Sequence, residues 1–136
     1  MISHSPPETE KFAADFASTL KAGDTVALLG GLGAGKTCFV RGMCASLSID
    51  PDSVTSPTFA IMNVYDGEIP LYHFDMYRIH SAADLETTGF YDFTDGIRVI
   101  EWSENISEFL PENTKFVKIS VINETDRIIK LENSRH

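Results

Sequence analysis

Residues 30–37 carry the clearest chemical signal in the chain. They read GGLGAGKT and fit the pattern G-x-x-x-x-G-K-[ST]. Glycines leave room for backbone N–H groups to converge on an anion. The Lys36 ammonium suits the β- and γ-phosphates of a nucleotide, and the Thr37 hydroxyl suits Mg²⁺. The pattern predicts a phosphate-binding loop; the alternative is a glycine-rich turn that binds nothing.

The segments on either side of the loop fit the same interpretation. Residues 25–29 form an apolar run typical of a buried parallel strand, and residues 38–47 are typical of a helix. The positive end of that helix would add to phosphate binding. The residues that we expect to hold a nucleotide here are Gly31, Leu32, Gly33, Ala34, Gly35, Lys36, Thr37 and Cys38.

A nucleotide-hydrolysing site also needs a carboxylate near Mg²⁺, and two strand ends offer one. Asp75 ends residues 69–75, and Glu101 ends residues 97–101. The second run is typical of a buried parallel strand, whereas the first follows a hairpin signal and resembles an antiparallel or edge strand. The pattern favours Glu101 for the metal and Asp75 for orienting water, with a solvent-facing carboxylate as the alternative for each.

Five further residues each have a functional and an ordinary interpretation. Thr58 and Ser56 follow the loop helix and could meet the γ-phosphate and Mg²⁺, or take part in turn chemistry. His73 could relay a proton or be structural. Trp102 could contact the nucleotide, a partner or the core. Arg78 could act as a charge clamp or form a surface ion pair.

The remaining pattern predicts one domain over residues 1–136, with residues 1–7 frayed. A helix is expected over residues 8–20, a hairpin of strands over 60–65 and 69–75, and short helices after Ser81 and Ser103; further strands are expected at 97–102, 116–122 and 127–131. The expected fold is a three-layer α/β domain like that of the P-loop NTPases. Its sheet should be mainly parallel, with antiparallel hairpins appended.

Charge and composition narrow the class of partner. The formal net charge is −9, from 20 acidic and 11 basic residues, which argues against a chain that grips nucleic acid alone. No apolar run reaches membrane-spanning length and the first residues do not resemble a signal peptide, so we expect a cytoplasmic protein without a membrane partner. Cys38 and Cys44 lie on different faces of one predicted helix, so neither a disulfide nor a metal site is expected.

Two absences bear on the substrate. No Asn-Lys-x-Asp guanine-reading motif is present, which favours ATP and ADP over guanine nucleotides. The chain has only five scattered arginines. A small-molecule kinase usually applies several to its phosphates, so that alternative is disfavoured.

Five segments in fixed order resemble one family. GGLGAGKT, TSPTF, HFDMYR, DLETTGFYDF and IEW occur at short spacings. In these motifs the chain resembles the TsaE family, small bacterial ATPases of tRNA threonylcarbamoyladenosine biosynthesis, over roughly residues 9 to 104. The chain departs from the family pattern at Gly31, where an acidic residue is usual, and at Ser103, where proline is common.

The resemblance implies a cytoplasmic ATPase that acts on the two protein subunits of the bacterial threonylcarbamoyl transferase complex and contacts tRNA only indirectly. That complex modifies an adenosine of tRNAs that read ANN codons. Carried over, Gly33, Gly35, Lys36 and Thr37 bind phosphates and Mg²⁺, Glu101 is a second Mg²⁺ ligand, Asp75 and Lys36 serve hydrolysis, and Thr9 lies near the nucleotide. We expect hydrolysis to be slow alone and stimulated by partners. The alternatives are a small-molecule kinase and a nucleotide-gated binding module.

Overall fold

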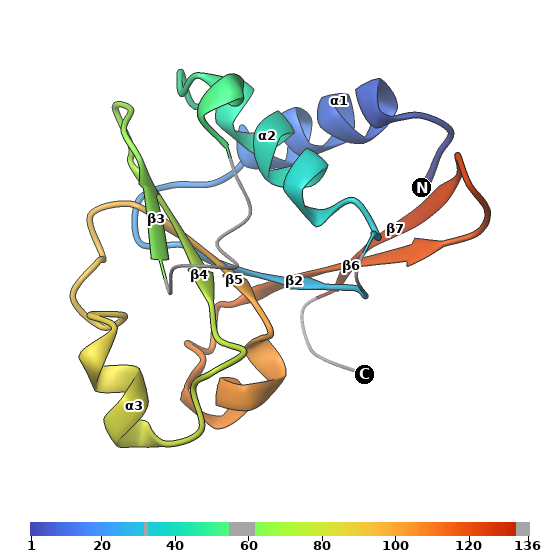
Figure 1. Cartoon of the computed structure of the whole chain (residues 1–136). Coiled ribbons are helices and arrows are strands. Elements are labelled where there is room, and N and C mark those ends of the chain that lie inside the picture. The colour runs from blue at the N-terminus through green and yellow to red at the C-terminus, as the bar shows by residue number, and fades with distance from the viewer. Residues whose placement is uncertain (32, 55–61, 133–136) are drawn as a thin grey trace.

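The chain folds around one mixed β-sheet. The computed structural model describes residues 1–31, 33–54 and 62–132. Within these ranges seven strands form a sheet in the order β1-β7-β6-β2-β5-β4-β3 (Figure 1). The strands are β1 (Ile2–Ser3), β2 (Thr25–Leu29), β3 (Met62–Tyr65), β4 (Leu71–Asp75), β5 (Ile97–Glu101), β6 (Lys115–Val121) and β7 (Arg127–Glu132).

Parallel pairing lies at the centre of the sheet and antiparallel pairing at its edges. β2 pairs in parallel with β5 and β6, and β5 pairs in parallel with β4. The antiparallel pairs are β3–β4, β6–β7 and β1–β7. The predicted α/β class is therefore confirmed. β4 is antiparallel to β3, as expected, but it also pairs in parallel with β5 and is not an edge strand. Its buried side chains allow it an inner place in the sheet.

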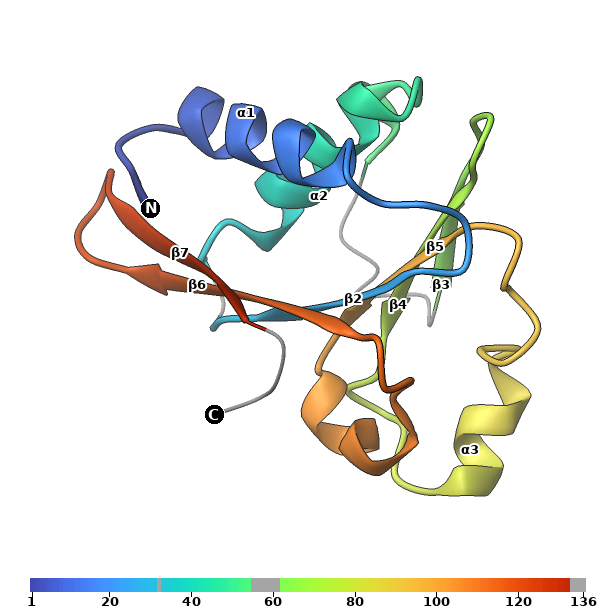
Figure 2. The same ribbon diagram turned by 180° about the vertical axis from the view of Figure 1, so that it is seen from behind.

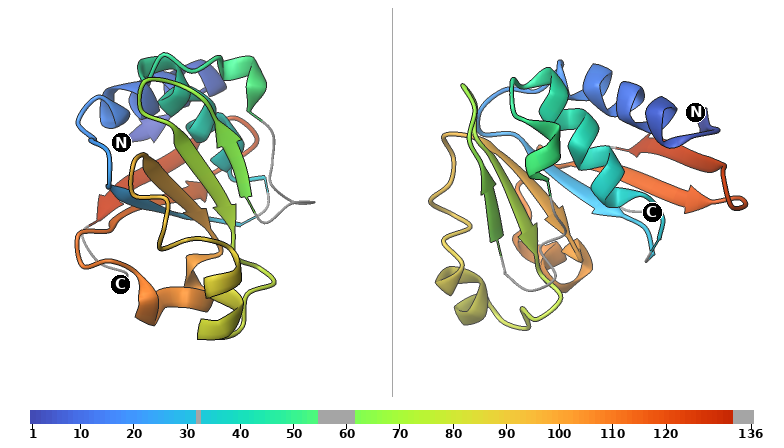
Figure 3. Two further views of the ribbon diagram at one scale, coloured as in Figure 1. Left: turned by 90° about the vertical axis from the view of Figure 1, so that its left-hand side faces the viewer. Right: turned by 45° about the horizontal axis from the view of Figure 1, so that its top comes forward.

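Helices cover both faces of this sheet, which gives the expected three layers. α1 (Pro6–Ala17) and α2 (Lys36–Ser46) pack on one face, and α3 (Ala82–Thr87) and the 3₁₀ segment η3 (Ser103–Phe109) lie on the other (Figures 2 and 3). Each face has its own apolar cluster. Val26, Leu28 and Val99 point to α1 and α2. Phe74 and Ile100 point to α3 and η3.

The first seven residues are ordered by pairing rather than frayed. Ile2 and Ser3 pair with Ile128 and Arg127 of β7. The side chain of Ser5 then caps α1 by accepting a hydrogen bond from the Glu8 N–H at 3.3 Å. The prediction of a frayed start was wrong. The sequence around residues 1–7 does not reveal this pairing, because the partner strand lies at the other end of the chain.

α2 is fixed close to α1 by small and aromatic residues. A Cβ at Gly42 would overlap the backbone of Glu10, so glycine is needed for the two helices to approach. The ring of Phe39 lies 6.0 Å from that of Phe16 between them. No helix in the described ranges has the length and apolar character needed to cross a bilayer. Together, β2 and the α1–α2 pair give the intervening loop a rigid frame.

Candidate functional site

The glycine loop joins the end of β2 to the start of α2, as the sequence predicts. Gly33 and Gly35 have φ values of +77° and +100°, which side chains rarely adopt. Chain neighbours aside, a Cβ built on Gly31, Gly33 or Gly35 would meet no atom of the described residues within 4 Å, so among these residues the space beside the loop is open. At Gly30, by contrast, a Cβ would lie 2.7 Å from the Ile119 oxygen of β6. The loop is thus anchored at its start and open along its middle.

The start of α2 leaves N–H groups available to an anion. Gly35 is the N-cap, and no side chain caps this helix. The first four N–H groups of a helix have no partner inside it, and they carry the positive end of its dipole. The geometry therefore fits a bound phosphate group.

Three ionisable side chains meet next to this helix start. Lys36 Nζ lies 3.3 Å from Glu101 Oε1, and Glu101 Oε2 lies 2.6 Å from His73 Nε2. They come from α2, β5 and β4, and all three are buried. Charges that leave water need partners at this distance, and each member of this cluster has one. We call Lys36, Glu101 and His73 the carboxylate cluster.

Glu101 stays readily ionised in this cluster despite its burial. Burial by itself would raise the pKa of its carboxyl group. The hydrogen bond and charge of His73 and the charge of Lys36 outweigh that effect and hold the pKa below its ordinary value. Glu101 therefore presents a carboxylate, the form that a metal ion requires.

Asp75 lies beside Glu101 at the same end of the sheet. Asp75 and Glu101 are register partners on the parallel strands β4 and β5. The Asp75 carboxylate is half-buried and accepts a 2.8 Å hydrogen bond from the Tyr77 N–H. The structure thus brings both predicted carboxylates to one edge, with Glu101 nearer to Lys36.

Trp102 lies at the site as well as against the second apolar cluster. Lys36 Nζ is 5.5 Å from the centre of its ring, and the Tyr77 ring is 5.0 Å away. Trp102 has a left-handed backbone, with φ +59°, which turns the chain sharply after β5. Trp102 therefore contacts both the core and the candidate site. Arg78 is exposed, and no ion pair of its side chain occurs among the described residues.

The start of α1 lies against the start of α2. Cys38 Sγ donates a 3.4 Å hydrogen bond to the Pro6 oxygen. Thr9, one turn further along α1, is buried with its hydroxyl 2.6 Å from that of Ser3. Cys38 and Cys44 are free thiols, as the sequence predicts, and burial raises the pKa of Cys44 to about 12. The start of α1 therefore lies near the loop helix, while the side chain of Thr9 contacts β1.

Some expected residues lie outside the described ranges, and two unexpected ones appear. Leu32, Ser56 and Thr58 fall outside the described residues. The role of His73 as the partner of Glu101 was missed, although strand alternation already placed it on the face of Asp75. Arg127 was missed entirely: its Nε donates to the Ala34 oxygen at 3.2 Å and its Nη2 to the Gly33 oxygen at 3.3 Å. No local sequence signal links Arg127 to a loop so far away in the chain.

The side chains present fit a magnesium ion better than a dedicated metal cage. No group of three or more His, Cys, Asp or Glu side chains suited to a metal occurs among the described residues. Mg²⁺ is typically held by one or two carboxylates, with phosphate oxygens and water completing its shell. Thr37 and Glu101 could supply the protein's share of such a shell.

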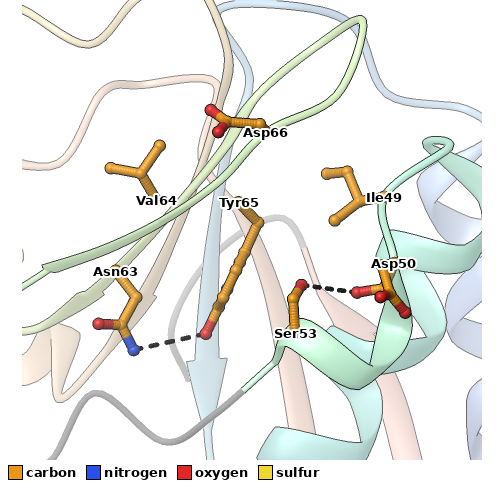
Figure 4. Close-up of a pocket in the computed structure, with 7 residues that line it drawn as sticks. All are labelled: Ile49, Asp50, Ser53, Asn63, Val64, Tyr65 and Asp66. Carbon is orange, nitrogen blue, oxygen red and sulfur yellow. Dashed lines mark hydrogen bonds between the residues drawn. The ribbon is translucent and has the colours of Figure 1, made fainter.

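The described residues also form a shallow pocket. It has a volume of about 450 Å³ and lies between the β3–β4 hairpin and the short 3₁₀ segment η1 (Pro51–Ser53) (Figure 4). Its lining residues are Ile49, Asp50, Ser53, Asn63, Val64, Tyr65 and Asp66. None of them belongs to the loop or the carboxylate cluster, but the ring of Tyr65 lies 6.2 Å from that of His73.

Comparison with known proteins identifies the family of this chain. A family model described as "Threonylcarbamoyl adenosine biosynthesis protein TsaE" matches residues 3–129. This chain belongs to the TsaE family. The match takes in the loop, both carboxylates and Arg127.

Two curated TsaE relatives and one solved structure illustrate the similarity. The "tRNA threonylcarbamoyladenosine biosynthesis protein TsaE" of Treponema pallidum is 38% identical over 130 residues, which cover 94% of this chain and 96% of the relative. The protein of the same name from Bacillus subtilis is 38% identical over 125 residues, covering 91% and 78%. The crystal structure of Bacillus subtilis YdiB superposes with a TM-score of 0.74 at 32% identity and covers 95% of this chain and 80% of that one.

Proposed function

We propose that this TsaE-family chain binds ATP, hydrolyses it slowly, and serves tRNA threonylcarbamoyladenosine modification by acting on the two-subunit threonylcarbamoyl transferase complex. The names of its relatives support the pathway. The observation that supports the chemistry is the carboxylate cluster beside an open glycine loop. There a buried lysine and an ionised carboxylate meet at an uncapped helix start.

Each group at the site, backbone or side chain, has a proposed role that fits its position. Backbone N–H groups of Gly33 and Gly35 and the ammonium of Lys36 would bind the β- and γ-phosphates. The Thr37 hydroxyl and the Glu101 carboxylate would hold Mg²⁺, which supplies charge neutralisation on the phosphates when bound. Asp75, at the neighbouring strand end, would accept a hydrogen bond from the attacking water and orient it.

His73 prepares Glu101 for this role. The 2.6 Å contact between His73 Nε2 and Glu101 Oε2 leaves Oε1 facing Lys36. Binding of a nucleotide with its metal would give Lys36 and Glu101 new partners in place of each other. The buried His73 keeps the carboxylate charged and oriented during that exchange.

Slow hydrolysis follows from the small positive charge in the site. Lys36 is the one lysine or arginine side chain that contacts Glu101 among the described residues. Charge that develops on the γ-phosphate in the transition state would then be only partly compensated. A partner that contributes a cation or orders the site would raise the rate.

The test is tRNA modification over many turnovers by the transferase subunits, with ATP hydrolysis followed in parallel. Reactions with no added chain, the intact chain, Lys36→Ala and Lys130→Ala are compared. Lys130 is an exposed lysine of β7 and serves as the matched control. Only the intact chain and Lys130→Ala should sustain turnover, with hydrolysis that rises when the subunits are present.

Two outcomes would contradict parts of the proposal. If the chain binds ATP but modification does not depend on it, the pathway is wrong and a search for a phosphoryl acceptor follows. If Asp75→Ala abolishes hydrolysis yet sustains modification, the chain is a nucleotide-gated binding module rather than an ATPase that drives turnover.

A further inference from the structure

Arg127 connects the far end of the chain to the glycine loop. It is the first residue of β7 and pairs with Ser3 of β1 and Val121 of β6. Its guanidinium donates hydrogen bonds to two loop carbonyls, from Nε to Ala34 at 3.2 Å and from Nη2 to Gly33 at 3.3 Å. The start of α2 lies beside the β6–β7 pair in the fold (Figure 1).

These two carbonyls belong to the peptide groups that a phosphate-binding loop depends on. In a trans peptide group the C=O and the following N–H point in opposite directions. Fixing the Ala34 oxygen toward Arg127 therefore aims the Gly35 N–H the other way, into the concave side of the loop. The Gly33 oxygen is held in the same way, but the N–H of that peptide group, the Ala34 N–H, donates a 3.2 Å hydrogen bond to the Gly31 oxygen. The Gly35 N–H is therefore the one that this restraint directs toward a ligand.

The charge of the guanidinium strengthens this effect. A hydrogen bond from a cation polarises the peptide group that accepts it, so the N–H at its other end becomes a better donor. Glycine at positions 33 and 35 lets the peptide groups of the loop rotate more freely than those of other residues. A hydrogen bond from outside the loop therefore does more to fix their orientation than it would in an ordinary helix.

Arg127 is itself held in place by the hairpin turn. Its Nη1 donates to the Asn123 oxygen at 2.8 Å and the Asp126 oxygen at 3.0 Å. The Asn123 side-chain oxygen accepts hydrogen bonds from the N–H groups of Thr125 and Asp126, both at 2.9 Å. The guanidinium thus links a fixed turn to a loop built mostly of glycine.

We propose that Arg127 is a positioning residue that holds the Gly33 and Ala34 carbonyls outward so that the Gly35 N–H is oriented toward a nucleotide β-phosphate before it binds. This inference rests on the proposed nucleotide binding at the loop. It assigns the β6–β7 hairpin, which carries no motif, a part in phosphate recognition.

The test uses the full chain with Arg127→Gln and Arg127→Lys, and Lys130→Gln as the control for loss of charge from the same strand. Affinities for ADP and AMP are measured by titration calorimetry, since only ADP carries a β-phosphate. The Gly35 amide signal is followed in ¹⁵N–¹H spectra of the nucleotide-free proteins. Thermal unfolding is measured for each.

Arg127→Gln should lower the ADP-over-AMP affinity ratio about tenfold, as expected for loss of a charged hydrogen bond. Arg127→Lys, which keeps the charge but cannot form the forked contact, should lower the ratio as well. Both should shift the Gly35 signal, whereas Lys130→Gln should change neither readout. A loss of ADP and AMP binding in equal proportion would instead indicate a general structural role and overturn the inference.

Failure of the inference and failure of the proposed function are separable. If the intact chain binds ADP and the Arg127 variants keep its ADP-over-AMP ratio within twofold, the inference is overturned and nucleotide binding stands. If the intact chain binds no ADP, the proposed function fails. In that case the Gly35 signal alone tests the inference, and a signal unchanged in Arg127→Lys would show that Arg127 does not orient the loop.

Discussion

The glycine loop and the carboxylate cluster are neighbours built in opposite ways. Along its middle the loop has open space on one side, where a Cβ at three of its glycines would meet no atom of the described residues within 4 Å, chain neighbours aside. The cluster consists of three buried side chains from α2, β4 and β5, each paired within 3.3 Å. The middle of the loop should therefore contribute to ligand binding with little effect on stability, whereas the cluster should contribute to both.

The largest effect on stability is expected from breaking the cluster. Glu101→Gln keeps the shape of the side chain but leaves Lys36 and His73 buried without their negative partner. Removing one member of a buried ion pair is strongly destabilising, so we expect a loss of about 3 kcal/mol in the free energy of unfolding. Urea unfolding followed by circular dichroism, without nucleotide, measures it.

Glu108→Gln is the matched control because Glu108 is an exposed glutamate of the adjoining η3. It should change stability by less than about 0.5 kcal/mol. Equal stability of the two variants would show that the cluster contributes no more than a surface charge does.

The second prediction concerns the pH dependence of that loss. Burial raises the pKa of Glu101, but His73 and Lys36 lower it more, so the folded pKa lies below the ordinary value of 4.5. The unfolded chain then binds the proton more readily, and the stability that Glu101 contributes is fully present above pH 4.5 and lost as the pH falls through the folded pKa.

The stability difference between the intact chain and Glu101→Gln should therefore narrow as the pH is lowered from 6 toward 3. Urea midpoints across that range, at constant ionic strength, measure the difference. A difference that widened on acidification would mean that the folded pKa of Glu101 is raised rather than lowered.

The smallest effects on stability are expected from substitutions in the glycine loop. They should differ between its start, which packs against β6, and its middle, which is open. Gly30→Ala places a Cβ 2.7 Å from the Ile119 oxygen at a φ of +155°, which should cost about 2 kcal/mol of stability. Gly31→Ala meets open space without a positive φ, so its stability should change by less than about 0.5 kcal/mol. Thermal unfolding of the nucleotide-free proteins compares the two, and similar losses would show that the whole loop is packed.

Features set by neighbouring residues were predictable. Strand, loop and helix around residues 25–47 were expected and observed, although α2 begins at Lys36, two residues earlier than expected. In β4, Tyr72 and Phe74 pack in the second apolar cluster and His73 does not, a separation that can be read from the sequence because side chains alternate along any strand. The Ser81 cap of α3 was likewise readable, and its hydroxyl accepts a hydrogen bond from the Asp84 N–H at 3.1 Å.

Features that depend on residues far apart in the chain could not be predicted. Examples are the pairing of β1 with β7, the parallel pairing of β4 with β5 and the hydrogen bonds of Arg127 to the loop. In each case, nothing in the sequence of one segment indicates which other segment it contacts. The strand pattern favoured Glu101 for the metal and Asp75 for orienting water, and this assignment stays a prediction. The structure adds that Glu101 lies 3.3 Å from Lys36.

The sequence by itself determined the loop, because glycine spacing, a lysine and a threonine act through local backbone geometry. It also determined the family, through motifs that stand in fixed order. The tertiary structure alone decided which charges meet. The strand order placed His73 on Glu101 across 28 residues and Arg127 on Ala34 across 93, since only folding brings such distant groups within hydrogen-bond distance.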